Sequence, residues 1–178
     1  AKPEIPASGT LAALAPDGRK LGKLAGQLDK ATKGAITRAL EASRFKGGAE
    51  EFLTILAPAG VEVARIIVAG IGAPAKYDAL AAQSLGGRLV AALNGTGEKD
   101  VSVWIEQIGD MKMDEAAFAA NVAYGARLRF YRFDKYKTKE KPKQKPSLTH
   151  FSVLTADAAD AKRHKRVQDA ERVAACET

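Results

Sequence analysis

The sequence predicts an α/β fold in three layers, with helices flanking both faces of a mixed β-sheet. Short apolar runs typical of strands alternate with longer segments whose apolar residues recur every three or four positions, as they do in helices. The run at 64–72 is apolar at nearly every position, which favours a central strand buried on both sides. A chain that alternates in this way covers its sheet with helices on two faces.

The first half of the chain supplies three expected strands and two expected helices. A strand is expected at 10–15, where TLAALA ends in a Pro-Asp-Gly turn, and a single helix is expected from Leu21 to about Ser43. Two strands should follow at 50–58 and 64–72, and the short connection between them favours an antiparallel pair. The second helix is expected from about Tyr77 to Leu93.

The second half continues the alternation. A strand is expected at 100–107, followed by a helix at 115–130 with Asp114 as its N-cap. The residues expected on the core side of that helix are Phe118, Val122, Gly125 and Leu128. A lysine-rich loop, a last strand and a last helix are expected at 135–147, at 149–156 and from 158. The sequence therefore predicts one α/β domain over 1–157 and a linker helix over 158–178.

Positive charge is concentrated in one segment. Residues 127–145 carry nine basic and two acidic side chains, or +7, which equals the formal net charge of the whole chain. The only cysteine, Cys176, leaves no partner for an internal disulfide. No apolar run approaches the ~20 residues of a membrane-spanning helix. A cytoplasmic protein without a membrane partner is the expectation.

The residues offer little support for a catalytic centre. His150 and His164 stand apart, and the sequence holds neither a His-Glu-x-x-His motif, nor paired cysteines, nor Gly-x-Ser-x-Gly. We expect both histidines to be surface or structural residues. Asp157 and Asp160 fall at an expected helix start, where the helix dipole accounts for them. No catalytic or metal-binding residue is therefore assigned.

A glycine turn is the candidate for cofactor binding. Gly70-x-Gly72-x-x-Ala75 follows a strand and precedes a helix, as dinucleotide-binding turns do, and Glu106 ends the next strand, where a ribose-binding acid would sit. In a macro-domain-like fold a similar turn would cradle ADP-ribose. Pro74 stiffens this turn, however, and an antiparallel neighbour departs from the usual parallel unit. We favour the alternative, a tight turn with no bound cofactor.

The basic segment 127–145 allows two interpretations. Aromatic residues alternate with cations there, a composition used for base stacking and phosphate contact in nucleic-acid-binding proteins. The favoured alternative is a helix end whose aromatics Tyr131 and Phe133 anchor in the core, followed by an extended, solvated lysine loop. Weak, non-specific contact with polyanions is still expected. The lysines expected to make it are Lys139, Lys141, Lys143 and Lys145.

Three segments resemble the N-terminal domain of leucyl (cytosol) aminopeptidases. The first is GARLRFYRFDKYKTK at 125–139, and the second is IIVAGIG at 66–72, which is similar to an apolar strand ending in Gly-Leu-Gly. The third is ERVAACET at 171–178, which resembles the helix that leads into an Arg-Asp-Leu-Val-Asn segment. The matching residues of the first segment are Gly125, Leu128, Tyr131, Phe133, Tyr136 and Lys137.

The resemblance implies a division of labour. Members of that family are cytosolic hexameric exopeptidases in which two divalent metals, zinc or manganese, are bound by the C-terminal domain. Several metal ligands lie in an Asn-Thr-Asp-Ala-Glu-Gly-Arg stretch, which this chain lacks, so no catalytic residue is carried over. The chain is then expected to be an assembly and regulatory domain, inactive alone, with its own catalytic domain and identical subunits as partners. A nucleotide- or ADP-ribose-binding module and a nucleic-acid-binding domain remain the alternatives.

Overall fold

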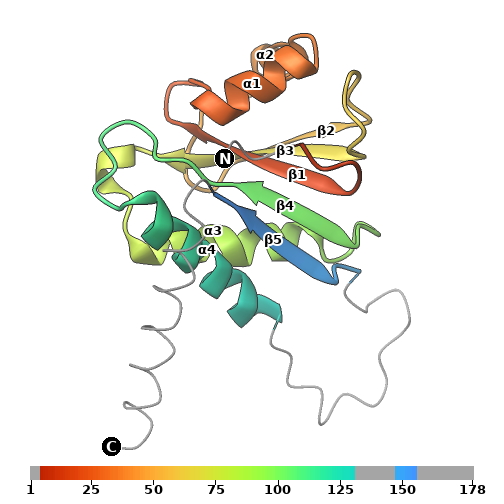
Figure 1. Ribbon diagram of the computed structural model, residues 1–178. Coiled ribbons are helices and arrows are strands. Elements are labelled where there is room, and N and C mark those ends of the chain that lie inside the picture. The colour runs from red at the N-terminus through yellow and green to blue at the C-terminus, as the bar shows by residue number, and fades with distance from the viewer. Residues whose placement is uncertain (1–4, 131–146, 156–178) are drawn as a thin grey trace, which may run out of the picture.

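The computed structural model describes residues 5–130 and 147–155, which form a five-stranded sheet between two helical layers (Figure 1). The strands are β1 (Thr10–Pro16), β2 (Phe52–Leu56), β3 (Arg65–Gly72), β4 (Asp100–Trp104) and β5 (His150–Leu154). The helices are α1 (Lys23–Ala31), α2 (Ala35–Ala42), α3 (Ala79–Leu93) and α4 (Glu115–Phe130), with a short 3-10 helix at Pro74–Lys76.

The sheet is mixed, as the sequence predicts. Its strand order is β2-β3-β1-β4-β5, in which β1 runs parallel to both of its neighbours and β4 runs parallel to β5. The edge strand β2 is antiparallel to β3, which confirms the expected antiparallel pair. All seven residues of β1 are buried, and so are seven of the eight in β3, which confirms a central strand covered on both sides.

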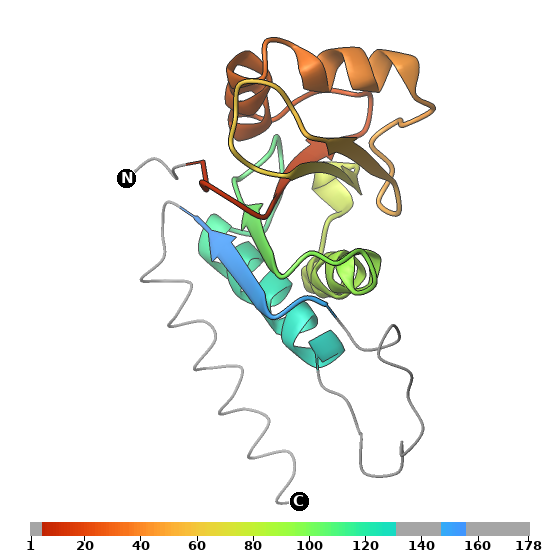
Figure 2. The same ribbon diagram turned by 90° about the vertical axis from the view of Figure 1, so that its right-hand side faces the viewer.

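Each face of the sheet has its own apolar core. Leu11 and Ala13 of β1 point to the core beneath α1 and α2, whereas Ala12 and Leu14 point to the core beneath α3 and α4. This alternation follows from the period of two along a strand. Figures 1 and 2 show the two helix pairs on opposite sides of the sheet, so the three-layer prediction is confirmed.

The expected helix at 21–43 is wrong in one respect, because the structure divides it into α1 and α2. Lys33 and Gly34 both adopt positive φ, 53° and 79°, and end the first helix. The carboxylate of Asp29 then accepts a hydrogen bond from the backbone nitrogen of Thr37 at 2.9 Å, inside the first turn of α2. Apolar spacing alone carries no signal for such a break, because the apolar face continues through it.

The starts of α3 and α4 are set by aspartate caps. Asp78 accepts from the backbone nitrogen of Ala81 at 2.8 Å, and Asp114 accepts from that of Ala117 at 2.7 Å. The Asp114 cap confirms the prediction, whereas the Asp78 cap starts α3 two residues later than expected. One core assignment on α4 is wrong, because Leu128 is 48% exposed. The last buried residues of the helix are Gly125 and Ala126, and at ~100° per residue Leu128 lies far around the axis from Ala126.

Several predictions fall outside the described residues. They concern the aromatics Tyr131 and Phe133, the lysine loop, His164 and the last helix. Among the residues that the structure does describe, no helix has the length and apolar character required to cross a membrane.

Candidate ligand crevice at the carboxyl ends of the strands

A crevice of about 460 Å³ opens where the parallel strands end. The segment after β1 leads to a helix on one face of the sheet, and the segment after β4 leads to a helix on the other, so the two segments diverge. In open α/β sheets this divergence is where ligands bind. The residues that line the crevice are Pro16, Asp17, Lys20, Leu21, Gly22, Lys23, Pro74, Glu106, Gln107, Ile108 and Gly109.

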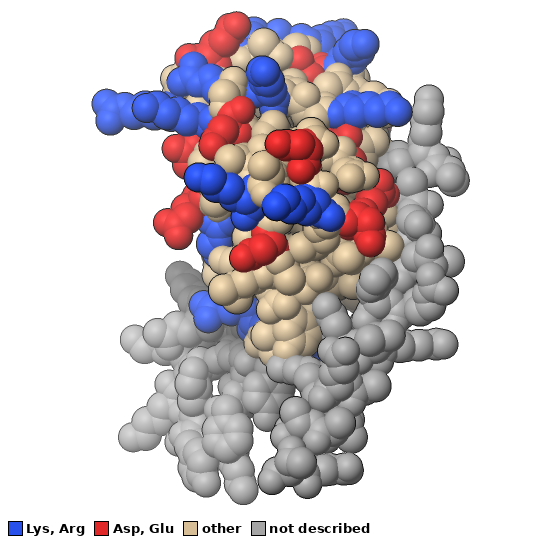
Figure 3. Space-filling view, turned by 90° about the vertical axis from the view of Figure 1, so that its left-hand side faces the viewer, with Lys and Arg blue, Asp and Glu red and all other residues tan. Residues whose placement is uncertain are grey.

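The charge around this end of the molecule is mixed. Figure 3 views the side toward which the arrowheads of β4 and β5 point in Figure 1, and it shows basic and acidic side chains interspersed across that face. The crevice lining itself contains two lysines and two carboxylates, so its formal charge is zero. This lining therefore does not create an extended electrostatic field of one sign, which would steer a charged ligand.

Glu106 is held inside the crevice against the start of α1. The strand β4 ends at Trp104, three residues earlier than expected, and the chain then turns so that Glu106 is only 9% exposed. Its Oε1 and Oε2 accept hydrogen bonds from the backbone nitrogen of Leu24 at 2.9 and 3.1 Å. The N-cap of α1, Gly22, has no side chain, and the first turn of α1 contains no acid. Glu106 therefore caps α1 from a distant part of the chain.

Two opposing effects act on the Glu106 carboxyl. Burial raises its pKa, because a charged carboxylate loses its hydration, and the hydrogen bonds from the backbone of Leu24, Lys23 and Ala25 partly offset this. A Cβ at Gly22 would lie 2.3 Å from Oε1 of Glu106, so any other residue at this position would require the carboxylate to move. The position of Glu106 thus accounts for the glycine at position 22. Neither role was visible in the sequence, because Glu106 and the Leu24 nitrogen that it caps are 82 residues apart.

The glycine turn, which the sequence offered as a candidate cofactor contact but which we interpreted as a tight turn, packs against the protein's own backbone. A Cβ at Gly70 would lie 2.0 Å from the carbonyl oxygen of Gly48. Gly72 has a φ of +70°, and its backbone nitrogen donates to the carbonyl oxygen of Gly47 at 2.8 Å. These glycines permit a close approach of two backbone segments, and neither is among the residues that line the crevice. Glu106 does not reach toward this turn as a ribose-binding acid would.

A second carboxylate shapes the segment that meets the glycine turn. Oε2 of Glu51 accepts hydrogen bonds from the consecutive backbone nitrogens of Lys46, Gly47 and Gly48, at 2.5, 2.9 and 3.2 Å. These bonds, the one from Lys46 foremost, hold the pKa of Glu51 below its usual range. Sequence analysis did not identify this role. A glycine pair followed three residues later by a glutamate is the signal that could have indicated it.

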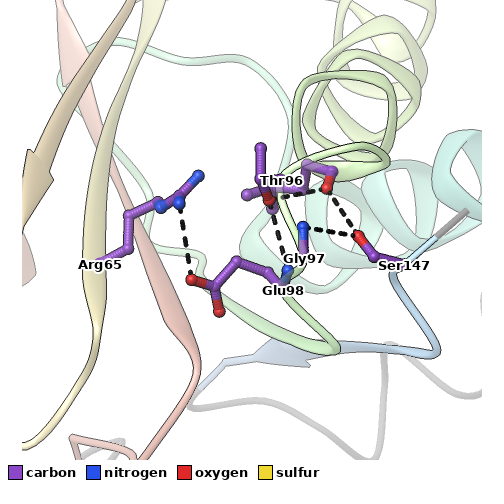
Figure 4. Close-up of polar contacts among 6 residues, drawn as sticks. Arg65, Thr96, Gly97, Glu98 and Ser147 are labelled. Atoms are coloured by element: carbon purple, nitrogen blue, oxygen red, sulfur yellow. Dashed lines mark hydrogen bonds and ion pairs between the residues drawn. The ribbon is translucent and has the colours of Figure 1, made fainter. Parts of the chain in front are cut away.

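A group of polar contacts at the end of α3 connects it to β5 and β3 (Figure 4). Oγ of Ser147 donates to the carbonyl oxygen of Leu93 and accepts from the backbone nitrogen of Gly97, both at 3.2 Å. Nearby, a nitrogen of Arg65 lies 3.6 Å from a carboxylate oxygen of Glu98. These contacts fix where the chain enters β5, and we interpret them as structural.

His150 lies on the surface, as expected. Its Nδ1 is 2.8 Å from Oδ1 of Asp100, and its side chain is 75% exposed. Within residues 5–130 and 147–155, no group of three His, Cys, Asp or Glu side chains is placed to hold a metal ion.

Comparison with known proteins gives a consistent result. Residues 11–140 match the model of the cytosol aminopeptidase family, N-terminal domain. A probable cytosol aminopeptidase of Caulobacter vibrioides is 34% identical over 157 residues, which cover 88% of this chain and 30% of that protein. One of Rhodopseudomonas palustris is 41% identical over 130 residues, which cover 72% of this chain and 25% of that protein. The chain therefore spans less than a third of the length of these relatives.

Solved structures share the fold. A tomato leucine aminopeptidase mutant superposes with a TM-score of 0.69 at 20% identity, covering 94% of this chain and 36% of that one. A macrodomain of Oceanobacillus iheyensis superposes with a TM-score of 0.65 at 10% identity, covering 94% of this chain and 88% of that one. The second similarity confirms the macro-domain-like fold. On the family match and its relatives, the chain belongs to the cytosol aminopeptidase family and corresponds to that family's N-terminal domain.

Proposed function

We propose that this chain is the assembly and regulatory domain of a cytoplasmic dimetal leucyl aminopeptidase, a hydrolase that removes N-terminal residues from peptides. The observation that carries the proposal is the family match over 11–140, together with relatives named as probable cytosol aminopeptidases. In this proposal residues 1–157 form the domain, and residues 158–178 link it to a C-terminal catalytic domain. Identical subunits, arranged as a hexamer, are the other partners.

The metal chemistry belongs elsewhere in this proposal. Zinc or manganese would activate water in the catalytic domain, as two-metal sites do in aminopeptidases. Among the described residues no group of three or more His, Cys, Asp or Glu side chains is placed to hold a metal ion, and in this proposal the ligands come from the catalytic domain. The described residues supply a folded domain with a separate apolar core on each face of its sheet.

A chimera provides the test. This chain would replace the matching 30% of the Caulobacter vibrioides relative, and leucine p-nitroanilide hydrolysis would be measured with zinc or manganese. We expect the chimera to assemble and hydrolyse the substrate, while the chain alone does not. Turnover that co-purifies with the chain alone would contradict the proposal. So would a chimera that assembles no better than the relative's remaining part without any N-terminal domain.

A nucleotide- or ADP-ribose-binding module is the second candidate. The observations that favour it are the macrodomain similarity and the crevice at the carboxyl ends of the strands. The position of Glu106 opposes it, because a buried carboxylate repels phosphate groups at the end of the crevice where a helix N-terminus would bind them.

A further inference from the structure

We propose that Glu106 is a built-in anion that occupies the anion-binding end of the crevice and keeps external anions out. Removal of its side chain then exposes a latent site for inorganic phosphate and similar small oxyanions. The proposal concerns this chain's own residues and holds whether or not the chain serves an aminopeptidase.

The first argument is that the start of α1 needs an anion and receives one. The first backbone N–H groups of a helix lack partners within the helix, and the helix dipole makes that end positive. In α1 the N-cap is Gly22, and the first turn has no acidic residue that could supply a negative charge locally. The carboxylate of Glu106 supplies it instead, and both of its oxygens accept hydrogen bonds from the backbone nitrogen of Leu24.

The second argument is steric. Glu106 is 9% exposed and lies so close to Gly22 that a Cβ there would be 2.3 Å from its Oε1. The same Cβ would be 3.5 Å from Cδ1 of Ile108, so the backbone of Gly22 is closely approached by both side chains. An external anion can reach the Leu24 nitrogen only if the Glu106 side chain leaves.

The third argument is the charge of the lining. Lys20 and Lys23 contribute +2 and Asp17 and Glu106 contribute −2, which sums to zero. Without the Glu106 carboxylate the same lining carries +1. The crevice therefore changes from neutral to attractive for anions when this one group is removed.

The test compares Glu106→Ala with the wild-type chain, using inorganic phosphate as the probe and the backbone amide signal of Leu24 in NMR spectra as the readout. We expect phosphate to shift the Leu24 amide of Glu106→Ala with at least tenfold tighter binding than in the wild type. Formate should raise the melting temperature of this variant and leave that of the wild type unchanged, because formate replaces the missing carboxylate. Unchanged phosphate affinity in Glu106→Ala would overturn the proposal.

Two further variants separate occupancy from general effects. Glu106→Gln removes the charge but keeps the crevice filled, so it should gain much less phosphate binding than Glu106→Ala; an equal gain there would contradict the role of Glu106 as an occupant. Asp78→Ala removes another helix cap, outside the crevice, and should also gain nothing. An equal gain in that control would show that any uncapped helix binds phosphate under these conditions. If Glu106→Ala does not fold in plain buffer, recovery of the fold in formate supports the proposal, and failure to recover overturns it.

Discussion

Gly125 of α4 lies against the carbonyl oxygen of Gln83 in α3, so closely that a Cβ at Gly125 would be 1.8 Å from that oxygen. Gly125→Ala should therefore push the two helices apart and destabilise the fold. Overpacking of this kind costs ~1–3 kcal/mol, and the rigid backbone partner places this site toward the upper end. The free energy of unfolding in urea measures the effect.

A glycine with open surroundings provides the control for that substitution. Gly26 lies inside α1, and nothing stands within 4 Å of the Cβ that alanine would add. Gly26→Ala should stabilise the chain by ~0.5–1 kcal/mol, because alanine is the better helix former. Equal effects of the two substitutions would show that α3 and α4 do not approach each other as described.

Tyr77 should make the fold sensitive to alkali. Burial raises the pKa of its phenol, and the hydroxyl donates to the carbonyl oxygen of Ala81 at 3.2 Å. An acid whose pKa is raised by folding contributes stability that is present below its unfolded pKa and lost as the pH rises above it. We therefore expect the urea midpoint to fall between pH 9 and pH 11.5, across the ordinary tyrosine pKa of about 10. The urea midpoint of Tyr77→Phe should fall less over the same pH range. An equal fall in the wild type and in this variant would contradict the role of Tyr77.

Glu51 should make the fold sensitive to acid, whereas Tyr77 makes it sensitive to alkali. Its pKa is lowered by the hydrogen bonds from Lys46 and its neighbours, so its contribution is present above the unfolded pKa and lost as the pH falls through the folded one. Melting temperatures taken from pH 6 down to pH 3 should drop further for the wild type than for Glu51→Gln. If both lose the same amount, Glu51 does not hold the 46–48 backbone in solution.

The lysine loop should bind polyanions weakly. Each phosphate contact releases counterions, so binding of DNA or RNA measured by fluorescence anisotropy should fall steeply as salt rises. Replacing Lys139, Lys141, Lys143 and Lys145 with Gln should remove the binding. If these lysines are solvated, as the sequence predicts, the melting temperature should stay nearly unchanged, because exposed charges contribute little to folding. Sequence-selective, salt-resistant binding would instead favour a dedicated nucleic-acid interface.

Local sequence patterns predicted the sheet well. Features that depend on contacts between distant segments could not be predicted in this way. The apolar run of β3 and the Asp114 cap each leave their signal within a few residues, so both were predicted correctly. The division between α1 and α2 depends on positive φ at two residues inside a continuous apolar pattern. Glu106 could not be assigned because its partner, Leu24, is near in space and remote in sequence.

The central position of β1 also bears on how the chain is synthesised. The strand is made first among the five, yet both of its neighbours, β3 and β4, follow it in the sequence. At ~5–20 residues per second, β4 leaves the ribosome roughly 5–20 s after β1. Until β3 is made both edges of β1 lack their permanent partners, and the edge that β4 will occupy stays open for the whole interval. In this state apolar strands of neighbouring nascent chains can pair with each other. Alanines at 12, 13 and 15 give β1 a low intrinsic tendency to form strands, which limits such pairing until its own neighbours arrive.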